Sequence, residues 1–126
     1  MTTTDSYEGP GDETSLIDVS VVIVSYNSCA VLDECLLSIK SATACTYEII
    51  VVDNGSKDGS AQLVQDRHPD AKLIRNTRNR GFAAATNQGT LIARGRYLFM
   101  LNPDVVVRSG AIDRLVEFLD SHGDFG

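Results

Sequence analysis

The sequence predicts an α/β fold in which a mostly parallel sheet is flanked by helices. Short, β-branched apolar runs recur along the chain, and each is followed by a segment with the apolar spacing of a helix. This alternation is typical of βαβ units with right-handed crossovers, which place their strands parallel in one sheet. The chain has 126 residues, 43% hydrophobic and 22% charged, which indicates one globular domain.

The first strand is expected over residues 19–25, where a continuous β-branched run indicates burial on both faces. Asn27 or Ser28 is expected to cap the helix that follows. The apolar stripe of that helix consists of Val31, Leu32, Cys35, Leu36 and Ile39.

A second buried strand is expected over residues 47–52. After a turn-rich segment, residues 60–68 have the pattern of a short helix that ends before Pro69. Residues 71–75 then predict a short third strand.

The last third of the chain continues the alternation. Residues 82–93 are expected to form a helix ended by Gly95, and residues 97–101 a fourth strand. Ser109 is expected to cap a final helix closed by Gly123. The sheet-facing side chains are expected to be Phe82, Thr86, Gly89 and Ala93 in the first of these helices, and Ile112, Leu115, Val116 and Leu119 in the second.

Charge and cysteine content exclude several classes of protein. Four of the 17 acidic residues and none of the 11 basic ones lie in residues 1–17, so we expect a flexible acidic tail there and a folded part over 18–126. That folded part is nearly neutral, which argues against a nucleic-acid partner. Three cysteines without CxxC spacing argue against a disulfide framework or zinc site, and we expect them to pack as reduced thiols. No signal peptide or run of ~20 apolar residues is evident, so we expect a cytoplasmic protein.

Polar residues follow each expected strand directly. Because the carboxyl ends of parallel strands meet at one edge of a sheet, these segments should lie together, where open α/β sheets bind ligands. Any one segment could be ordinary turn chemistry, but that reading does not explain a carboxylate at the end of two strands, Asp53 and Asp104. We call this edge the carboxyl rim: residues 25–27, 53–58, 76–81 and 102–104.

Carboxylates beside arginines suggest a ligand that has hydrogen-bond donors at one end and anionic oxygens at the other, as a nucleoside diphosphate has. Asp53 could accept the ring N–H of a pyrimidine, and Tyr26 could stack on the base. Asp104 could hold a divalent cation that neutralises the diphosphate. Arg75, Arg78 and Arg80 could reach the phosphates or remain solvated. The fingerprints GxGxxG and GxxxxGK[ST] are absent, which weakens dehydrogenase and NTPase readings.

Four ordered motifs resemble family 2 glycosyltransferases: VVIVSYN (21–27), IIVVDNGSKDGS (49–60), RNRGFAAATNQG (78–89) and LNPD (101–104). The Asn-Pro-Asp variant of the last motif is similar to the rhamnosyltransferase-like branch. The resemblance implies a GT-A nucleotide-diphospho-sugar transferase fold, here truncated to its N-terminal part, with Mg or Mn as the usual cation.

The resemblance also implies roles for individual residues. Ser25 and Tyr26 would line the nucleoside pocket, Asp53 would bind the base, and Asp58 would support its loop or help bind the nucleotide. The nucleotide-sugar site would comprise Ser25, Tyr26, Asn27, Asp53, Asn54, Asp58, Arg80, Gly81, Asn87, Asn102 and Asp104, with Asp104 as the metal ligand.

Two departures from the family pattern matter. Asn102 replaces a carboxylate, so it can bond a ribose hydroxyl but offers no charge to a cation. No residue matches the family's Asp or Glu catalytic base, which lies further along the chain in that family. We therefore expect the donor-binding half of an inverting enzyme.

The expected function is transfer of a sugar, with rhamnose favoured, from a dTDP- or UDP-linked donor to a polysaccharide or glycolipid acceptor. The alternative is a non-catalytic nucleotide-binding or interaction module derived from such an enzyme. A nucleotidyltransferase is a weaker third reading, since residues 25–28 form no Gly-rich basic loop. An exposed sheet edge would favour a homodimer, and the full-length form could associate peripherally with a membrane.

Overall fold

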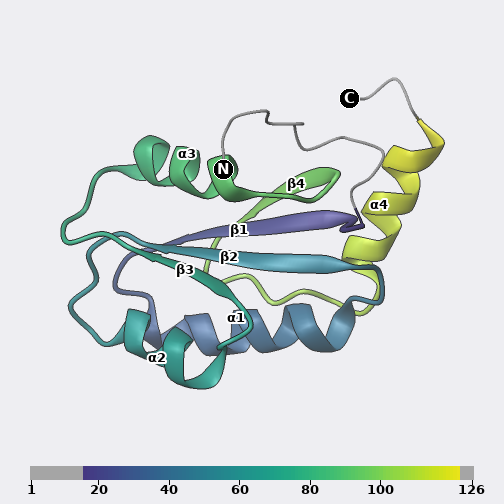
Figure 1. Ribbon diagram of the computed structural model, residues 1–126. Coiled ribbons are helices and arrows are strands. Elements are labelled where there is room, and N and C mark those ends of the chain that lie inside the picture. Colours follow the sequence, from purple (N-terminus) through teal and green to yellow (C-terminus); the bar gives the residue numbers. More distant parts are fainter. Residues whose placement is uncertain (1–15, 123–126) are drawn as a thin grey trace.

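A four-stranded parallel sheet forms the centre of the molecule. The computed structural model describes residues 16–122 (Figure 1). The strands lie in the order β3-β2-β1-β4, and all three neighbouring pairs are parallel. The elements along the chain are β1 (Val19–Ser25), α1 (Cys29–Ala42), β2 (Tyr47–Asp53), α2 (Ser60–Arg67), β3 (Lys72–Arg75), α3 (Phe82–Ile92), β4 (Tyr97–Leu101) and α4 (Ala111–Ser121). The predicted α/β class and element order are confirmed.

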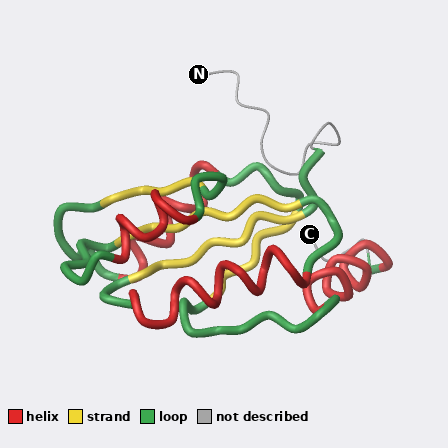
Figure 2. Tube along the Cα trace, turned by 90° about the horizontal axis from the view of Figure 1, so that it is seen from below, coloured by secondary structure: helices red, strands yellow, loops and turns green. Residues whose placement is uncertain are grey.

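Helices cover both faces of the sheet. One core joins the β1 and β2 side chains of one face to α1, α2 and α4, through residues such as Ile23, Leu36 and Val116. A smaller core on the opposite face packs Val22, Ile50 and Val52 against Ala85 of α3. Figure 1 shows α3 on one side of the sheet and α1 and α2 on the other, and Figure 2 shows the strands side by side in one layer.

Two expected core positions are wrong, and Val31, at the edge of the expected α1 stripe, is also exposed at 37%. Phe82 is 63% exposed because it is the first residue of α3, one turn before the buried Ala85, and follows an exposed loop. Leu115 is 51% exposed because α4 packs through the line of Ile112 and Val116, which leaves the neighbouring position outside.

Two expected helix boundaries also differ. Ser109 does not cap α4: Gly110 does, in a left-handed conformation with φ of 77°, and its N–H donates to the Ala42 carbonyl at 2.9 Å. α3 ends at Ile92, before Gly95. Gly95 instead allows a close approach, because a Cβ there would lie 2.5 Å from the Ser20 nitrogen of β1. Gly123 lies outside the described residues.

The three cysteines are free. Burial, followed by the nearby charge of Asp104, raises the pKa of the Cys35 thiol to about 11. Burial, followed by Asp113, raises the pKa of Cys45 to about 11. These two thiols therefore stay protonated near neutral pH, which fits packing residues better than nucleophiles.

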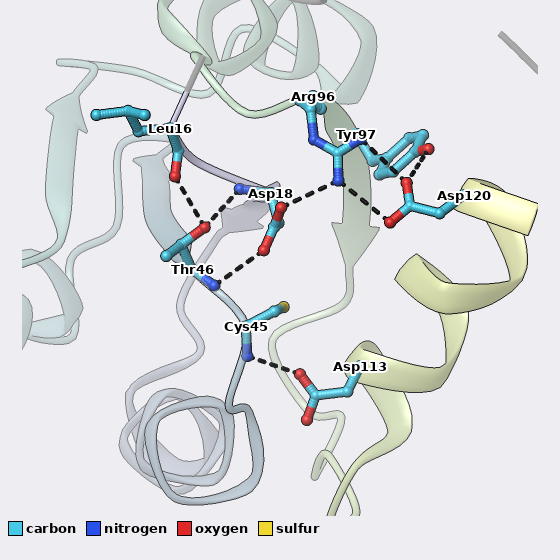
Figure 3. Close-up of polar contacts among 8 residues, drawn as sticks. All are labelled: Leu16, Asp18, Cys45, Thr46, Arg96, Tyr97, Asp113 and Asp120. Carbon is cyan, nitrogen blue, oxygen red and sulfur yellow. Dashed lines mark hydrogen bonds and ion pairs between the residues drawn. The ribbon is translucent and has the colours of Figure 1, made fainter. Parts of the chain in front are cut away.

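Polar contacts fasten α4 to the amino-terminal end of the sheet (Figure 3). The Arg96 guanidinium donates to Asp18 and to Asp120, each at 3.0 Å, and the Tyr97 hydroxyl donates to Asp120 at 2.6 Å. Asp113 accepts the Cys45 N–H at 2.8 Å. This end of the sheet is therefore closed by α4, and the opposite end carries the carboxyl rim.

Most of the expected tail lies outside the described residues. Its last two residues are bound to the fold, since the Leu16 carbonyl accepts from Thr46 and the Ile17 carbonyl from Arg96. The proposed domain boundary near residue 18 stays a prediction.

Candidate functional site

The carboxyl rim forms at the ends of adjacent strands. Ser25 of β1 is the register partner of Asp53 of β2, and Asp53 is the partner of Arg75 of β3. On the other side of β1, β4 ends at Leu101 opposite Ile23, and residues 102–104 follow at once. Asp53 and Asp104 therefore flank the same central strand, at the point where the chain crosses from one side of β1 to the other. Such switch points are where open α/β sheets hold ligands.

Both carboxylates also lie on the α1 side of the rim. Alternate strand residues share a face, so Ser25 and Asp53 share the face of Ile23 and Val51, which pack toward α1. On α1, the Cys35 thiol approaches the Asn102 carbonyl at 3.9 Å, and the charge of Asp104 acts on its pKa. The expectation that Asp53 and Asp104 would meet at one sheet edge is therefore consistent with the geometry.

Two buried oxygen atoms at this edge have no partner among the described residues. Asp53 is 3% exposed; its Oδ2 accepts the Ser56 N–H at 3.0 Å, while its Oδ1 accepts nothing. The hydroxyl of the fully buried Ser25, its register partner, is likewise unpaired. Because buried polar groups are nearly always hydrogen-bonded, this pair calls for an explanation, and a ligand donor is one.

Asn27 and Asp58 join the two loops beside this pair. Asn27 adopts a left-handed conformation with φ of 51°, accepts the Lys57 N–H at 2.9 Å on its side chain and donates its own N–H to Ser56. The Asp58 carboxylate accepts the Cys29 N–H at 2.9 Å and also bonds Ser60, which lowers the pKa of Asp58, with Ser60 as the largest cause. Ser28, at the N-cap of α1, makes no side-chain cap bond, so Asp58 satisfies the helix start instead. The Asn27 and Asp58 side chains therefore hold the loops after β1 and β2 together.

Asn54 is the centre of an amide network on the other side of the rim. Its side chain is buried, donates to Asn79 Oδ1 and to the Gly81 carbonyl, and accepts the Arg80 N–H. Asn76 donates to Asn54, and it exchanges two hydrogen bonds with Gln88 of α3. Asn76 and Asn79 lie in the expected rim segment 76–81, but neither they nor Gln88 were expected from the sequence as individual site residues.

The remaining expected site residues are exposed. They make no side-chain hydrogen bond among the described residues, so their polar groups are open to a ligand: Tyr26, Arg80, Asn87, Asn102 and Asp104. Gly81 has φ of 87°, and a Cβ added there would meet no atom within 4 Å, so its backbone is accessible.

The metal expectation meets a sparse donor set. Within residues 16–122, no group of three or more His, Cys, Asp or Glu side chains could hold a cation. Asp104 offers one exposed carboxylate, and Asn102 beside it offers a neutral amide. These residues fit a cation only if the ligand supplies most of the oxygens.

Sequence comparison assigns the chain to a family. Residues 20–125 match the model for glycosyl transferase family 2. The chain belongs to this family. The family 2 chain is 36% identical over 107 residues to the succinoglycan biosynthesis protein ExoO of Rhizobium meliloti. The aligned residues cover 84% of this chain and 31% of that protein. It is 30% identical over 109 residues to the N-acetylglucosaminyl-diphospho-decaprenol L-rhamnosyltransferase of Mycobacterium tuberculosis, covering 77% and 35%.

Solved structures show the GT-A fold. The family 2 chain superposes on S. aureus TarS with a TM-score of 0.77 at 23% identity, covering 85% of this chain and 33% of that one. It superposes on the Pyrobaculum calidifontis mannosyltransferase PcManGT, solved with GDP-Man and Mn2+, with a TM-score of 0.75 at 26% identity, covering 91% and 36%. The chain thus spans about a third of the length of these relatives. Among residues 16–122, no helix has the length and apolarity needed to cross a bilayer.

Proposed function

We propose that this family 2 chain binds the nucleoside-diphosphate part of an activated sugar, as the donor-binding half of a glycosyltransferase. The observation that carries the proposal is the unpaired, buried pair of Asp53 Oδ1 and Ser25 Oγ at the switch point of the sheet. A nucleobase N–H entering the rim would give the Asp53 carboxylate the donor that it lacks. S. aureus TarS, solved in complex with UDP and with UDP-GlcNAc, supports a ligand of this class.

The proposed roles depend on which side chains are already hydrogen-bonded within the chain and which have polar groups free to bind a ligand. Asp53 and Ser25 face the base, with the exposed Tyr26 beside it. Arg80, the Gly81 backbone and Asn87 serve the diphosphate and sugar, and Asn102 bonds a ribose hydroxyl. Asn27, Asn54 and Asp58 act indirectly, because their side chains are already bonded within the chain.

Asp104 is the proposed ligand of Mg or Mn, the cation being held mainly by the diphosphate. When bound, the cation would neutralise the diphosphate and assist its departure. The mannosyltransferase solved with Mn2+ supports this part of the proposal.

The proposed donor sugar and acceptor are based on similarity to two relatives. A rhamnosyl donor linked to dTDP or UDP is favoured by the match to the L-rhamnosyltransferase, and a polysaccharide or glycolipid acceptor by that relative and by the succinoglycan biosynthesis protein. We propose inverting transfer on the cytoplasmic side, with peripheral membrane association and homodimers as properties of the whole protein.

Calorimetry with UDP and dTDP, each with and without Mn2+, tests the proposal. We expect heat of binding with at least one nucleotide, and tighter binding with the cation present. A folded protein that gives no heat with either nucleotide would refute it.

One observation favours a non-catalytic variant of the same site. Asn102 replaces a carboxylate of the family pattern, so the site offers less negative charge to a cation. An assay for sugar release from the donor distinguishes a glycosyltransferase from a non-catalytic binding module. Turnover that disappears in Asp104→Ala supports the enzyme. Nucleotide binding without turnover supports the binding module.

A further inference from the structure

The loop between β3 and α3 is held from two directions. On one side, the Asn54 side chain makes hydrogen bonds of 3.1 Å to Asn79 Oδ1, 3.2 Å to the Gly81 carbonyl and 3.0 Å from the Arg80 N–H. A single buried amide therefore contacts three consecutive residues of the loop. Because an amide carries both donors and an acceptor, neither a carboxylate nor an aliphatic residue can make this set of bonds.

Close packing and a second amide pair complete the hold. A Cβ at Gly55 would lie 2.6 Å from the carbonyl carbon of Arg78, so the β2–α2 loop lies directly against this loop. Asn76 donates to Asn54 at 3.1 Å and pairs reciprocally with Gln88 of α3 at 2.8 and 2.9 Å. The loop position is therefore tied to the end of β2 and to the body of α3.

The loop carries charge that the chain itself does not neutralise. Arg78 and Arg80 are exposed, and neither forms an ion pair with an acidic side chain among residues 16–122. Asn54 follows Asp53 directly, so the residue that fixes these arginines adjoins the residue proposed to bind the base. The end of β2 therefore sets the distance between the Asp53 carboxylate and the loop that carries the two arginines.

We propose that Asn54 is a positioning residue that holds the Arg78–Arg80 loop at the distance from Asp53 at which its guanidinium groups meet the diphosphate of the donor. This inference rests on the proposed function. It assigns Asn54 an effect on the phosphate part of the ligand and none on the nucleoside part. Asn54 itself does not contact the ligand.

The test compares a nucleoside diphosphate with its nucleoside, using UDP with uridine or dTDP with thymidine. In Asn54→Ala, we expect diphosphate affinity to fall about tenfold, the size of one lost charge-assisted contact, with nucleoside affinity unchanged. Gln88→Ala removes only the hydrogen bonds between Gln88 and Asn76. It should lower diphosphate affinity by a smaller factor and also leave nucleoside affinity unchanged. Gln62→Ala on α2, an exposed amide bonded only to Asp66 in the described residues, is the matched control and should change neither affinity.

A double-mutant cycle separates positioning from general stability. If Asn54 acts through the loop arginines, Asn54→Ala should cause no further loss in an Arg78→Ala/Arg80→Ala background. Equal losses for diphosphate and nucleoside, an additive cycle, or full diphosphate affinity in a folded Asn54→Ala protein would each overturn the inference. If Asn54→Ala does not fold, Gln88→Ala carries the same comparison. A wild-type chain that binds neither nucleotide would instead refute the proposed function.

Discussion

At the scale of single residues, the two oxygens of Asp53 have different environments. Oδ2 accepts the Ser56 N–H and so fixes the turn after β2, whereas Oδ1 is buried and unpaired. A buried acceptor without a partner costs about 1–3 kcal/mol. The chain carries this cost at the residue where a base N–H would remove it, which makes Asp53 the most informative single substitution.

Asp53→Ala should weaken nucleotide binding by about 1–3 kcal/mol, because a charge-assisted hydrogen bond to the base is lost. Calorimetry with UDP or dTDP measures this, and circular dichroism verifies that the variant folds. Asp66→Ala, an exposed carboxylate on α2, is the control for the change in net charge and should bind as the wild type does. Unchanged affinity in a folded Asp53→Ala protein would remove Asp53 from the base pocket.

A second substitution addresses the cation. Asp104→Asn should remove most of the gain in nucleotide affinity that Mn2+ gives, because the amide keeps the shape of the side chain and loses its charge. Titrations with and without Mn2+ measure the gain in each protein. An equal gain in both proteins would show that the cation is held without Asp104.

At the scale of elements, the rim depends on loops that approach each other closely. Gly55 and Gly59 lie in the same β2–α2 loop with similar positive φ values of 83° and 89°. Only Gly55 is in tight contact, against the Arg78 and Asn79 backbone. The pair therefore separates the cost of the backbone conformation from the cost of the contact.

Gly59→Ala should destabilise the protein by about 1–2 kcal/mol, the cost of a side chain in the left-handed conformation. Gly55→Ala should cost a further 1–3 kcal/mol or so, because the methyl group must displace backbone. Urea unfolding monitored by circular dichroism measures both. Equal losses of stability would show that the two loops do not pack as described.

The attachment of α4 gives the fold a dependence on acid. The N–H groups of Cys45 and then Ala44 lower the pKa of Asp113 below its ordinary value of 3.8. Its folded pKa lies below the unfolded one, so Asp113 contributes stability above about pH 4. That contribution is lost as the pH falls through the folded value.

The stability difference between the wild type and Asp113→Asn should therefore be full at pH 7 and shrink below about pH 4. Urea unfolding at pH 7 and pH 3 measures the difference. A difference of the same size at both values would contradict this role for the carboxylate.

Local sequence pattern predicted the elements and the edge where their polar ends meet. The β-branched run of β1 and the residues at the strand ends, such as Asp53, are encoded within a few positions of the chain. The amide network is not, because Asn76 joins Asn54 of the β2 end to Gln88 of α3, and these residues come together only after α3 docks on the sheet. The same reason explains Phe82 and Ser109, whose burial and capping depend on neighbours that no local pattern specifies.

At the scale of the whole molecule, β4 is an edge strand with an apolar surface. Within residues 16–122, β4 pairs only with β1, and Leu98 and Met100 are 42% and 40% exposed. They share the sheet face of Val22, over which α3 packs. An exposed edge with apolar side chains favours association with another chain.

We expect the isolated chain to self-associate as its concentration rises. Light scattering measures the mass, and replacing Leu98 and Met100 by glutamine should shift the chain toward the monomer. A wild-type chain that stays monomeric at high concentration would contradict this expectation.

Binding of the nucleotide between the ends of β2 and β4 is the basis of every role proposed above, and backbone amide NMR during titration with UDP or dTDP examines it without any substitution. We predict shifts concentrated at residues 25–27, 53–58, 76–81 and 102–104, with little change around Asp18, Asp113 and Asp120 at the opposite end of the sheet. Shifts centred on that opposite end, or on only one of Asp53 and Asp104, would show that the nucleotide does not bind there.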